Sequence, residues 1–126
     1  MNALNRIINS IDQDDIENAK VQINEAYTLL DADSSYFSNS NLEEILFLFK
    51  AKKDDYLKRI QMLSQLMYCD FLVREDGFIK EQKLKKAIAL LEYQNLYSDE
   101  YSLELNNQLS QMKNMLIKID TKKLNL

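Results

Sequence analysis

Apolar residues recur along this chain at the three- and four-residue spacing of amphipathic helices. In the first stripe Leu4, Ile7, Ile8 and Ile11 fall at positions i, i+3, i+4 and i+7. Similar stripes follow, separated by short polar segments. They predict helices over residues 2–11, 14–30, 42–49, 54–74, 79–97 and 103–120. We therefore expect an all-α fold of about five to six helices, in a single domain over residues 1–126.

Short polar side chains mark the boundaries between the stripes. Residues 31–41 are rich in Asp, Ser and Asn, which favour turns and caps, so we expect a connector there. We expect Tyr36 and Phe37 to pin this connector to the body of the protein. Two predicted capping boxes, each a polar residue followed three positions later by Glu, are Asp14 with Glu17 and Ser40 with Glu43.

The backbone chemistry agrees with helix. The chain has one glycine, Gly77, and no proline. Tight turns between strands usually need such residues, whereas helices are weakened by both. We predict that Gly77 adopts a left-handed conformation and ends the helix over residues 54–74. A chain of 126 residues buries roughly two thirds of its unfolded surface, so it needs no metal or disulfide to hold a core.

The last predicted helix carries an apolar seam. Its residues are spaced by alternating steps of four and three, as in a coiled coil or an antiparallel helix pair; they are Leu105, Leu109, Met112, Leu116 and Ile119. Tyr93, Tyr97 and Tyr101 recur every four residues, and tyrosine suits both interfaces and the rims of small cores. These eight side chains are the candidate interface. Packing within one chain and packing between chains are both open at this point.

Charge is unevenly distributed along the chain. The net charge is −4, with −7 on residues 1–49 and +3 on residues 50–126. One predicted helix carries a candidate basic patch, which comprises Lys80, Lys83, Lys85 and Lys86. Such a patch binds nucleic acid by neutralising phosphates, or is simply a solvated helix face. Because Glu81 and Glu92 lie on the same helix, we favour the solvated face. The acidic balance of the whole chain argues against nucleic acid as a partner.

Several kinds of chemistry need residue types that this chain lacks. There is no histidine, so His-based triads and Cys/His zinc sites cannot be built. One glycine cannot form a phosphate-binding loop. The single cysteine, Cys69, lies in an apolar run and is interpreted as a small buried hydrophobe. The acids from Asp12 to Glu17 resemble the start of a calcium loop, but Ile23 stands where that loop needs a glutamate. We expect no cofactor, no metal and no small-molecule substrate.

The apolar runs are too short for a membrane span. The longest, residues 45–49 and 87–91, have five residues each, whereas a span needs about 20. The N-terminus is interrupted by polar residues and does not match a secretory signal. A lone cysteine gives no disulfide framework, which fits a reducing compartment. We therefore expect a cytoplasmic protein with no membrane partner.

A partial internal sequence repeat favours stacked antiparallel helical hairpins. Three apolar residues, Ile16, Ala19 and Ile23, are each followed 68 positions later by another apolar residue, namely Leu84, Ala87 and Leu91. This distance is about twice the tetratricopeptide period of roughly 34 residues. The segment over residues 85–95, followed by Tyr101-Ser102-Leu103-Glu104, resembles the closing hairpin of an uncharacterised family of small bacterial tetratricopeptide-like all-helical proteins. The similarity extends upstream to Ile23. It implies a fold and carries over no functional site, and the missing proline departs from a standard repeat.

These observations favour a non-enzymatic helical protein-interaction module, a scaffold or adaptor that binds a protein partner or a second copy of itself. The alternative is a nucleic-acid-associated regulatory protein that uses the patch from Lys80 to Lys86. A third and weaker alternative is a small helical enzyme with carboxylate chemistry, because acids are present in adjacent pairs.

Overall fold

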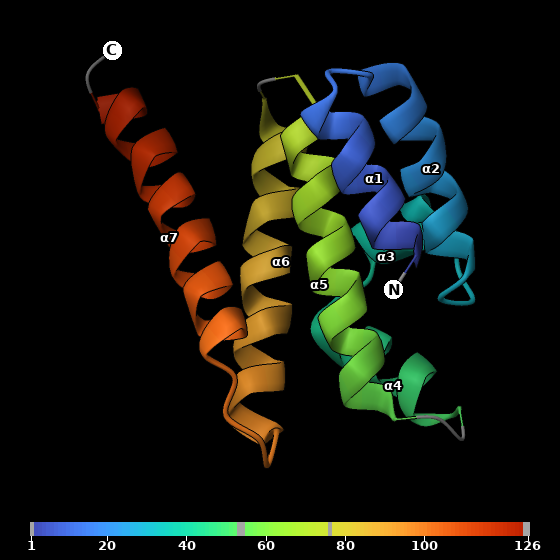
Figure 1. The fold of residues 1–126 in the computed structure, drawn as a ribbon. Helices are drawn as coiled ribbons and strands as arrows, with labels where there is room; N and C mark the ends of the chain where they lie inside the picture. Colours follow the sequence, from blue (N-terminus) through green and yellow to red (C-terminus); the bar gives the residue numbers. More distant parts are fainter. Residues whose placement is uncertain (1, 53–54, 76, 125–126) are drawn as a thin grey trace.

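The structure is a computed structural model that describes residues 2–52, 55–75 and 77–124. Within these ranges the chain forms seven helices (Figure 1). They are α1 (Asn2–Asp12), α2 (Ile16–Thr28), α3 (Ser34–Asn39), α4 (Leu42–Lys50), α5 (Tyr56–Val73), α6 (Phe78–Tyr97) and α7 (Leu103–Leu124). The all-α prediction is confirmed for the described residues. The predicted number of five to six is wrong, because the expected connector over 31–41 contains the short helix α3.

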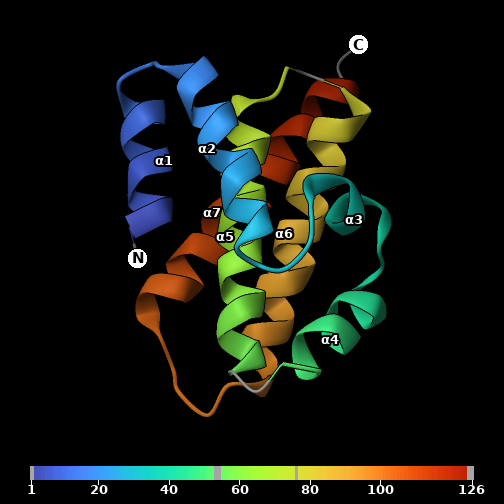
Figure 2. The same cartoon turned by 90° about the vertical axis from the view of Figure 1, so that its right-hand side faces the viewer.

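In Figure 1 the pairs α1–α2, α5–α6 and α6–α7 run in opposite directions, while α1 and α5 run in the same direction. α5 and α6 form the central pair, and a buried hydrogen bond from the Ser64 hydroxyl to the Ala87 carbonyl, 2.6 Å long, joins them. α1 and α2 pack on α5, while α7 packs on α6 from the other side. α3 and α4 lie along one side of the central pair (Figure 2). All seven helices contribute side chains to one buried apolar cluster.

The helix α3 depends on contacts with the rest of the protein. Its N-cap is Asp33, whose carboxylate accepts a hydrogen bond from the Tyr36 backbone N–H at 2.8 Å. Phe37 is fully buried, and its ring lies 5.9 Å from the rings of both Tyr27 and Phe49. The prediction that Phe37 pins this segment is therefore confirmed, while Tyr36 remains partly exposed and lies edge-on to Phe37. A six-residue helix is too short to be stable alone, so these contacts maintain it.

The N-caps of both predicted capping boxes are displaced by one residue, and a complete box is present only at α4. α2 is capped by Asp15 rather than Asp14, and Asp14 has a positive φ of 58° in the preceding turn. α4 has a complete capping box formed by Asn41 with Glu44. Ser40 cannot take that role because it is buried and ends α3. Local sequence gives two acceptable registers, and the packing of the neighbouring turn selects one.

The helices α5, α6 and α7 differ slightly from the predicted ranges. The predicted start at Asp54 lies outside the described residues, and α5 begins after its N-cap Asp55. Gly77 does not end α5, whose C-cap is Arg74. It is the N-cap of α6, at φ 148° and ψ −175°, a conformation that is essentially restricted to glycine. α7 continues to Leu124, four residues beyond the predicted end. No helix in the described ranges is both long and apolar enough to cross a membrane.

Candidate functional site

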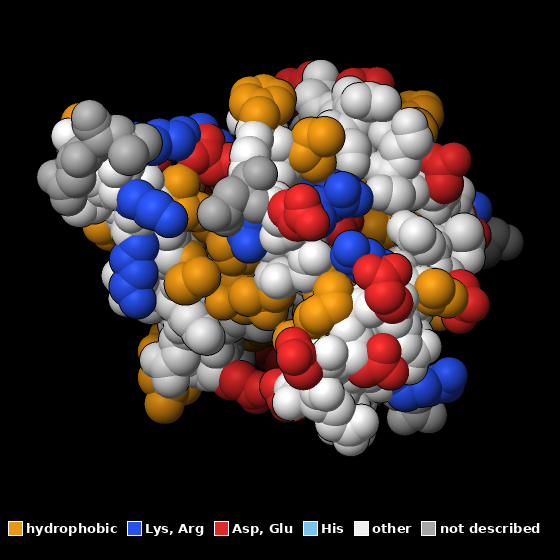
Figure 3. Space-filling view, turned by 90° about the horizontal axis from the view of Figure 1, so that it is seen from above, with side chains coloured by type: hydrophobic (Ala, Val, Ile, Leu, Met, Phe, Trp, Pro, Cys, Tyr) orange, Lys and Arg blue, Asp and Glu red, His pale blue; other side chains and the backbone are white. Residues whose placement is uncertain are grey.

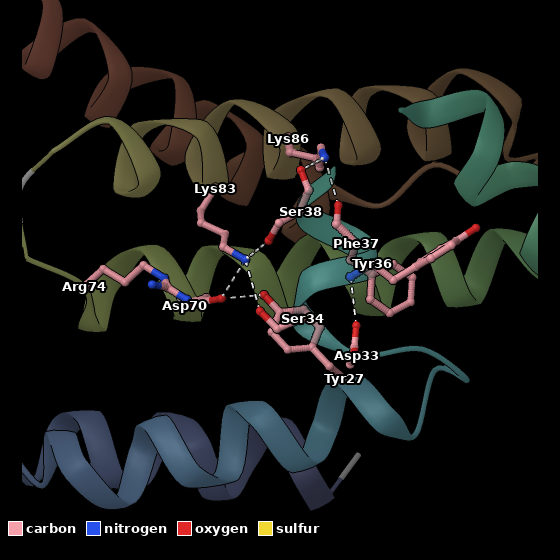
Figure 4. A network of polar contacts seen from close by, with 10 residues as sticks. All are labelled: Tyr27, Asp33, Ser34, Tyr36, Phe37, Ser38, Asp70, Arg74, Lys83 and Lys86. Carbon is pink, nitrogen blue, oxygen red and sulfur yellow. Dashed lines mark hydrogen bonds and ion pairs between the residues drawn. The ribbon is translucent and has the colours of Figure 1, made fainter. Parts of the chain in front are cut away.

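A buried polar network joins α2, α3, α5 and α6 (Figure 4). Asp70 of α5 is at its centre and is only 3% exposed. Its carboxylate accepts a hydrogen bond from the Tyr27 hydroxyl at 2.6 Å and another from Arg74 Nε at 2.7 Å, and it pairs with Lys83 Nζ at 3.1 Å. Burial raises the pKa of Tyr27 well above its ordinary value, and the Asp70 carboxylate adds to this shift. The hydroxyl therefore stays protonated and can donate to Asp70.

Lys83 connects this network to α3. It is 4% exposed, and its ammonium group donates to the Ser38 hydroxyl at 2.6 Å and lies 5.3 Å from the centre of the Tyr27 ring. Burial lowers the pKa of Lys83, while the Asp70 carboxylate opposes that shift. A buried ammonium group is costly unless its hydrogen bonds are satisfied, and here a carboxylate and a hydroxyl satisfy them.

Lys86, one turn later on α6, holds the end of α3. Its ammonium group donates to the backbone carbonyls of Phe37, Ser38 and Ser40 at 2.8, 2.9 and 2.7 Å. Carbonyls at a helix C-terminus lack partners within the helix, so a cation placed there is favourable. Burial lowers the pKa of Lys86, and the nearby Lys83 adds to the effect. This arrangement explains how a six-residue helix can end against the core.

The predicted solvated face is therefore wrong for Lys83 and Lys86. Both point inward, toward α3, because α6 lies between neighbours on two sides. Lys80 donates to the Arg74 carbonyl at 2.9 Å and lies 4.9 Å from the Phe71 ring. Lys85 is half exposed and lies 4.0 Å from Glu81. The four lysines do not present one continuous basic surface.

Sequence reasoning missed Asp70, the centre of the network. The available signal was an acid in the otherwise apolar run from Leu66 to Val73, every other residue of which except Leu72 is buried. A charged side chain on the buried face of a helix is rare without a partner. Its partners lie 43, 4 and 13 positions away, so the pattern indicates that a partner exists but does not identify it.

The network also fixes the turn between α5 and α6. Arg74, the C-cap of α5, is held by Asp70 through its guanidinium and by Lys80 through its carbonyl. Gly77 then allows the backbone to enter α6 directly. Phe78 and Ile79, the first residues of α6, are exposed to solvent at this end of the protein, at 74% and 60%.

A groove opens between α6 and α7 beside this turn. We name it the α6–α7 groove; its cavity has a volume of about 500 Å³. α7 leans away from α6 toward its C-terminal end (Figure 1). Phe78, Met115 and Ile119 form its apolar floor, and Lys118, Lys122 and Lys123 lie along α7. The end view shows hydrophobic side chains along this groove with basic ones on the α7 side (Figure 3).

The charge in the α6–α7 groove is positive. Among its described lining residues the one acid is Glu81, which is buried and pairs with Lys123 and, at 4.0 Å, with Lys85. Lys118 and Lys122 are exposed, four residues apart on one face of α7, and form no ion pair within the described ranges. Phe78 and Arg74 also line two adjoining hollows of about 560 and 420 Å³. Asp70 lines the first of these hollows, and Lys83 and Lys86 line the second.

The predicted seam of α7 packs within the chain. Leu109 and Met112 are buried against α6, at 9% and 0% exposure, and the other three seam residues are partly buried; these are Leu105, Leu116 and Ile119. Within this chain Leu109 and Met112 are therefore core residues, and only Ile119 reaches the α6–α7 groove. The tyrosines divide differently: the rings of Tyr93 and Tyr97 lie 4.5 Å apart, while Tyr101 is 78% exposed.

The described residues contain no cluster of three or more acidic, cysteine or histidine side chains suited to a metal ion. Cys69 is buried, and burial raises the pKa of its thiol to about 11, which disfavours the nucleophilic thiolate.

The polar atoms around Asp70 satisfy one another, an arrangement typical of a structural network. The α6–α7 groove combines apolar side chains with lysines that form no ion pair within the described ranges, so it is open to a ligand. Comparison with protein-family models, curated proteins and solved structures finds no match to this chain.

Proposed function

We propose that this chain is a non-enzymatic helical protein-interaction module whose α6–α7 groove binds an acidic, amphipathic segment of a protein partner. The observation that carries the proposal is the apolar floor of Phe78, Met115 and Ile119 beside the exposed lysines Lys118 and Lys122. Apolar anchors would fill the floor, and carboxylates would lie against the lysines. Helices in grooves are commonly recognised in this way.

The arrangement of the α1–α2 and α5–α6 hairpins supports the same proposal. Stacked antiparallel hairpins of the tetratricopeptide-like kind form grooves between successive helices, and α7 would supply the last wall. The rigid network around Asp70 would keep Phe78 in place before a partner arrives, which lowers the ordering cost of binding. We place the protein in the cytoplasm, where the single cysteine needs no disulfide partner.

A protein partner is better supported than nucleic acid. The alternative relies on the lysines from Lys80 to Lys86, and Lys83 and Lys86 are already bound to Asp70 and to the end of α3. Phosphate binding also needs several exposed cations spread over a face. The groove instead combines a few cations with a large apolar area, which suits an amphipathic segment more than a phosphate backbone.

The proposal is tested by fluorescence anisotropy with labelled helical peptides of about 20 residues that share one apolar face and carry either Glu or Lys on the other. We expect the acidic peptide to bind, with an affinity that falls as salt is added, and the basic peptide not to bind. Phe78→Ser should weaken binding at least about tenfold, because the central apolar contact is lost. Labelled duplex DNA serves as the competing probe.

Phe47→Ser is the matched control, because Phe47 is also a solvent-exposed phenylalanine, at 80% exposure, but lies on α4 away from the groove. It should leave peptide binding unchanged. If the protein binds duplex DNA but does not bind the acidic peptide, the nucleic-acid alternative is favoured. Equal losses for Phe78→Ser and Phe47→Ser would show that the groove is not the binding surface.

A further inference from the structure

The hairpin formed by α6 and α7 carries a second exposed surface at the end opposite the groove. We name it the acidic aromatic tip, residues 96–104. Its large apolar side chains are all well exposed, from 56% to 78%; they are Leu96, Tyr97, Tyr101 and Leu103. A group of four such side chains around one turn is unusual on a protein that acts alone. The tip also contains the predicted interface residues Tyr97 and Tyr101.

The tip is acidic where the groove is basic. Asp99, Glu100 and Glu104 lie on it, and the sequence has no Lys or Arg from residue 87 to residue 112. Asp99 and Glu100 are exposed and form no ion pair within the part of the chain that the structure describes. Of the nearby cations, Lys113 pairs with Glu92 at 3.4 Å. The tip therefore has the composition that the proposed function requires of a ligand: aromatic and aliphatic anchors beside carboxylates.

A chain cannot place its own tip in its own groove. The two surfaces lie at opposite ends of α6, a helix of 20 residues and so about 30 Å long. Figure 1 shows the turn between α6 and α7 at one end of the molecule and the C-terminal end of α7 at the other. Contact between tip and groove must therefore join two copies of the chain.

We infer that the acidic aromatic tip of one copy binds in the α6–α7 groove of another, so that copies associate head to tail. The inference rests on the proposed function of the groove. Tyr101 and Leu103 would contact the floor around Phe78, while Asp99 and Glu100 would lie against Lys118 and Lys122. Because each copy keeps one unused tip and one unused groove, the contact is heterologous and extends beyond a dimer unless a ring closes.

The test is a charge swap followed by sedimentation velocity. One variant, Lys118→Glu with Lys122→Glu, makes the groove acidic; the other, Asp99→Lys with Glu100→Lys, makes the tip basic. These four side chains are exposed, so both variants should fold. We expect wild-type protein to associate increasingly with concentration and less with added salt. Each variant alone should associate at least about tenfold more weakly, because its own tip and groove then carry like charges.

Mixing the two variants in equal amounts provides the decisive result. In the mixture each tip finds a groove of opposite charge, so association should return to near the wild-type level. A control with Lys58→Glu and Asp12→Lys, two exposed positions away from both surfaces, should behave like wild type. Variants that associate as strongly as wild type, or a mixture that stays monomeric, would overturn the inference.

A failure of this inference is distinguishable from a failure of the proposed function. If wild-type protein stays monomeric but the acidic peptide binds and Phe78→Ser abolishes that binding, the groove has a different acidic partner and head-to-tail association is wrong. If the peptide does not bind either, both proposals are wrong.

Discussion

The ammonium nitrogen of Lys83 lies 3.1 Å from Asp70 Oδ2, with both side chains almost wholly withdrawn from solvent. Such a pair adds little net stability relative to apolar residues, but it is costly to break. Removal of Lys83 would leave the buried Asp70 carboxylate with the partly exposed Arg74 as its cation. Here the pair also connects α5 to α6, and through Ser38 to α3. Asp70 also holds Arg74, the C-cap of α5, so the network reaches the end of α5 that lies near the groove.

We predict that Lys83→Met lowers the free energy of unfolding by about 1.5–3 kcal/mol, because the Asp70 carboxylate keeps Arg74 and Tyr27 but loses its buried cation. Lys85→Met is the matched control on the same helix. Lys85 is half exposed and lies 4.0 Å from Glu81, so its loss should cost about 1 kcal/mol or less. Urea denaturation of the two variants measures both values. Equal costs would contradict the structural role assigned to Lys83.

Tyr27→Phe should destabilise the protein by about 1–3 kcal/mol near neutral pH, since the buried carboxylate loses a donor at 2.6 Å. This cost should shrink at alkaline pH. Burial raises the pKa of Tyr27 above its ordinary value of 10.0, so the folded protein keeps the proton that the unfolded chain loses above that pH. The stabilising effect of the hydroxyl is therefore complete below pH 10 and falls by about 1.4 kcal/mol for each further pH unit.

The measurement for Tyr27 is a pair of urea titrations, at about pH 9 and about pH 11, on wild type and variant. Both proteins carry the same other titrating groups, so the difference between them isolates Tyr27. A difference that stays constant or grows between the two pH values would show that Tyr27 ionises normally in the folded protein.

Cys69 should react slowly with a thiol reagent in the folded protein. Burial raises the pKa of its thiol to about 11 from an ordinary value of 9.0, and the Asp70 carboxylate adds to the shift. At pH 8 the thiolate fraction is then roughly a hundredfold lower than for an exposed cysteine. Ellman's reagent should label the native protein at least that much more slowly than the protein in urea. Rapid labelling without urea would contradict the burial of Cys69.

Met112→Ala should cost about 2–5 kcal/mol of stability, because Met112 is fully buried between α7 and α6. Ile117→Ala is the matched control on the same helix; Ile117 is 60% exposed and its replacement should change stability by about 0.5 kcal/mol or less. Thermal unfolding followed by circular dichroism compares the two. Loss of association without loss of stability in Met112→Ala would show that the seam joins two chains instead.

The long helices were predictable because each carries an apolar stripe of several residues. Such a stripe identifies the helix even when its first and last residues are assigned wrongly. The helix α3 was not predictable, because six residues with one buried side chain, Phe37, give no periodic signal. Its stability depends on Lys83 and Lys86, whose partners in α3 lie 45 and 49 positions away in the sequence. Gly77 shows a related difficulty. A lone glycine between two helices suits the end of the first or the start of the second, and the packing of the turn decides between them.

The candidate site was predictable only in part. The spacing of the α7 seam correctly indicated a packed helix face, but not that α6 of the same chain covers it. Nothing in the positions of Lys118 and Lys122 distinguishes the rim of a groove from lysines that compensate the dipole at a helix C-terminus. The groove arises from the angle at which α7 leaves α6, which depends on contacts spread over both helices. Tyr97 and Tyr101 are exposed but lie outside the groove, so their role at an interface stays a prediction.

The most direct test of the central claim is an NMR titration of isotope-labelled protein with the acidic amphipathic peptide, recorded as amide and methyl chemical-shift changes. We predict that the largest changes fall on Phe78, Met115 and Ile119, with smaller ones along the Lys118 face of α7. Changes confined to other surfaces, or a spectrum that does not change when the peptide is in excess, would contradict the proposal that the α6–α7 groove binds a protein partner.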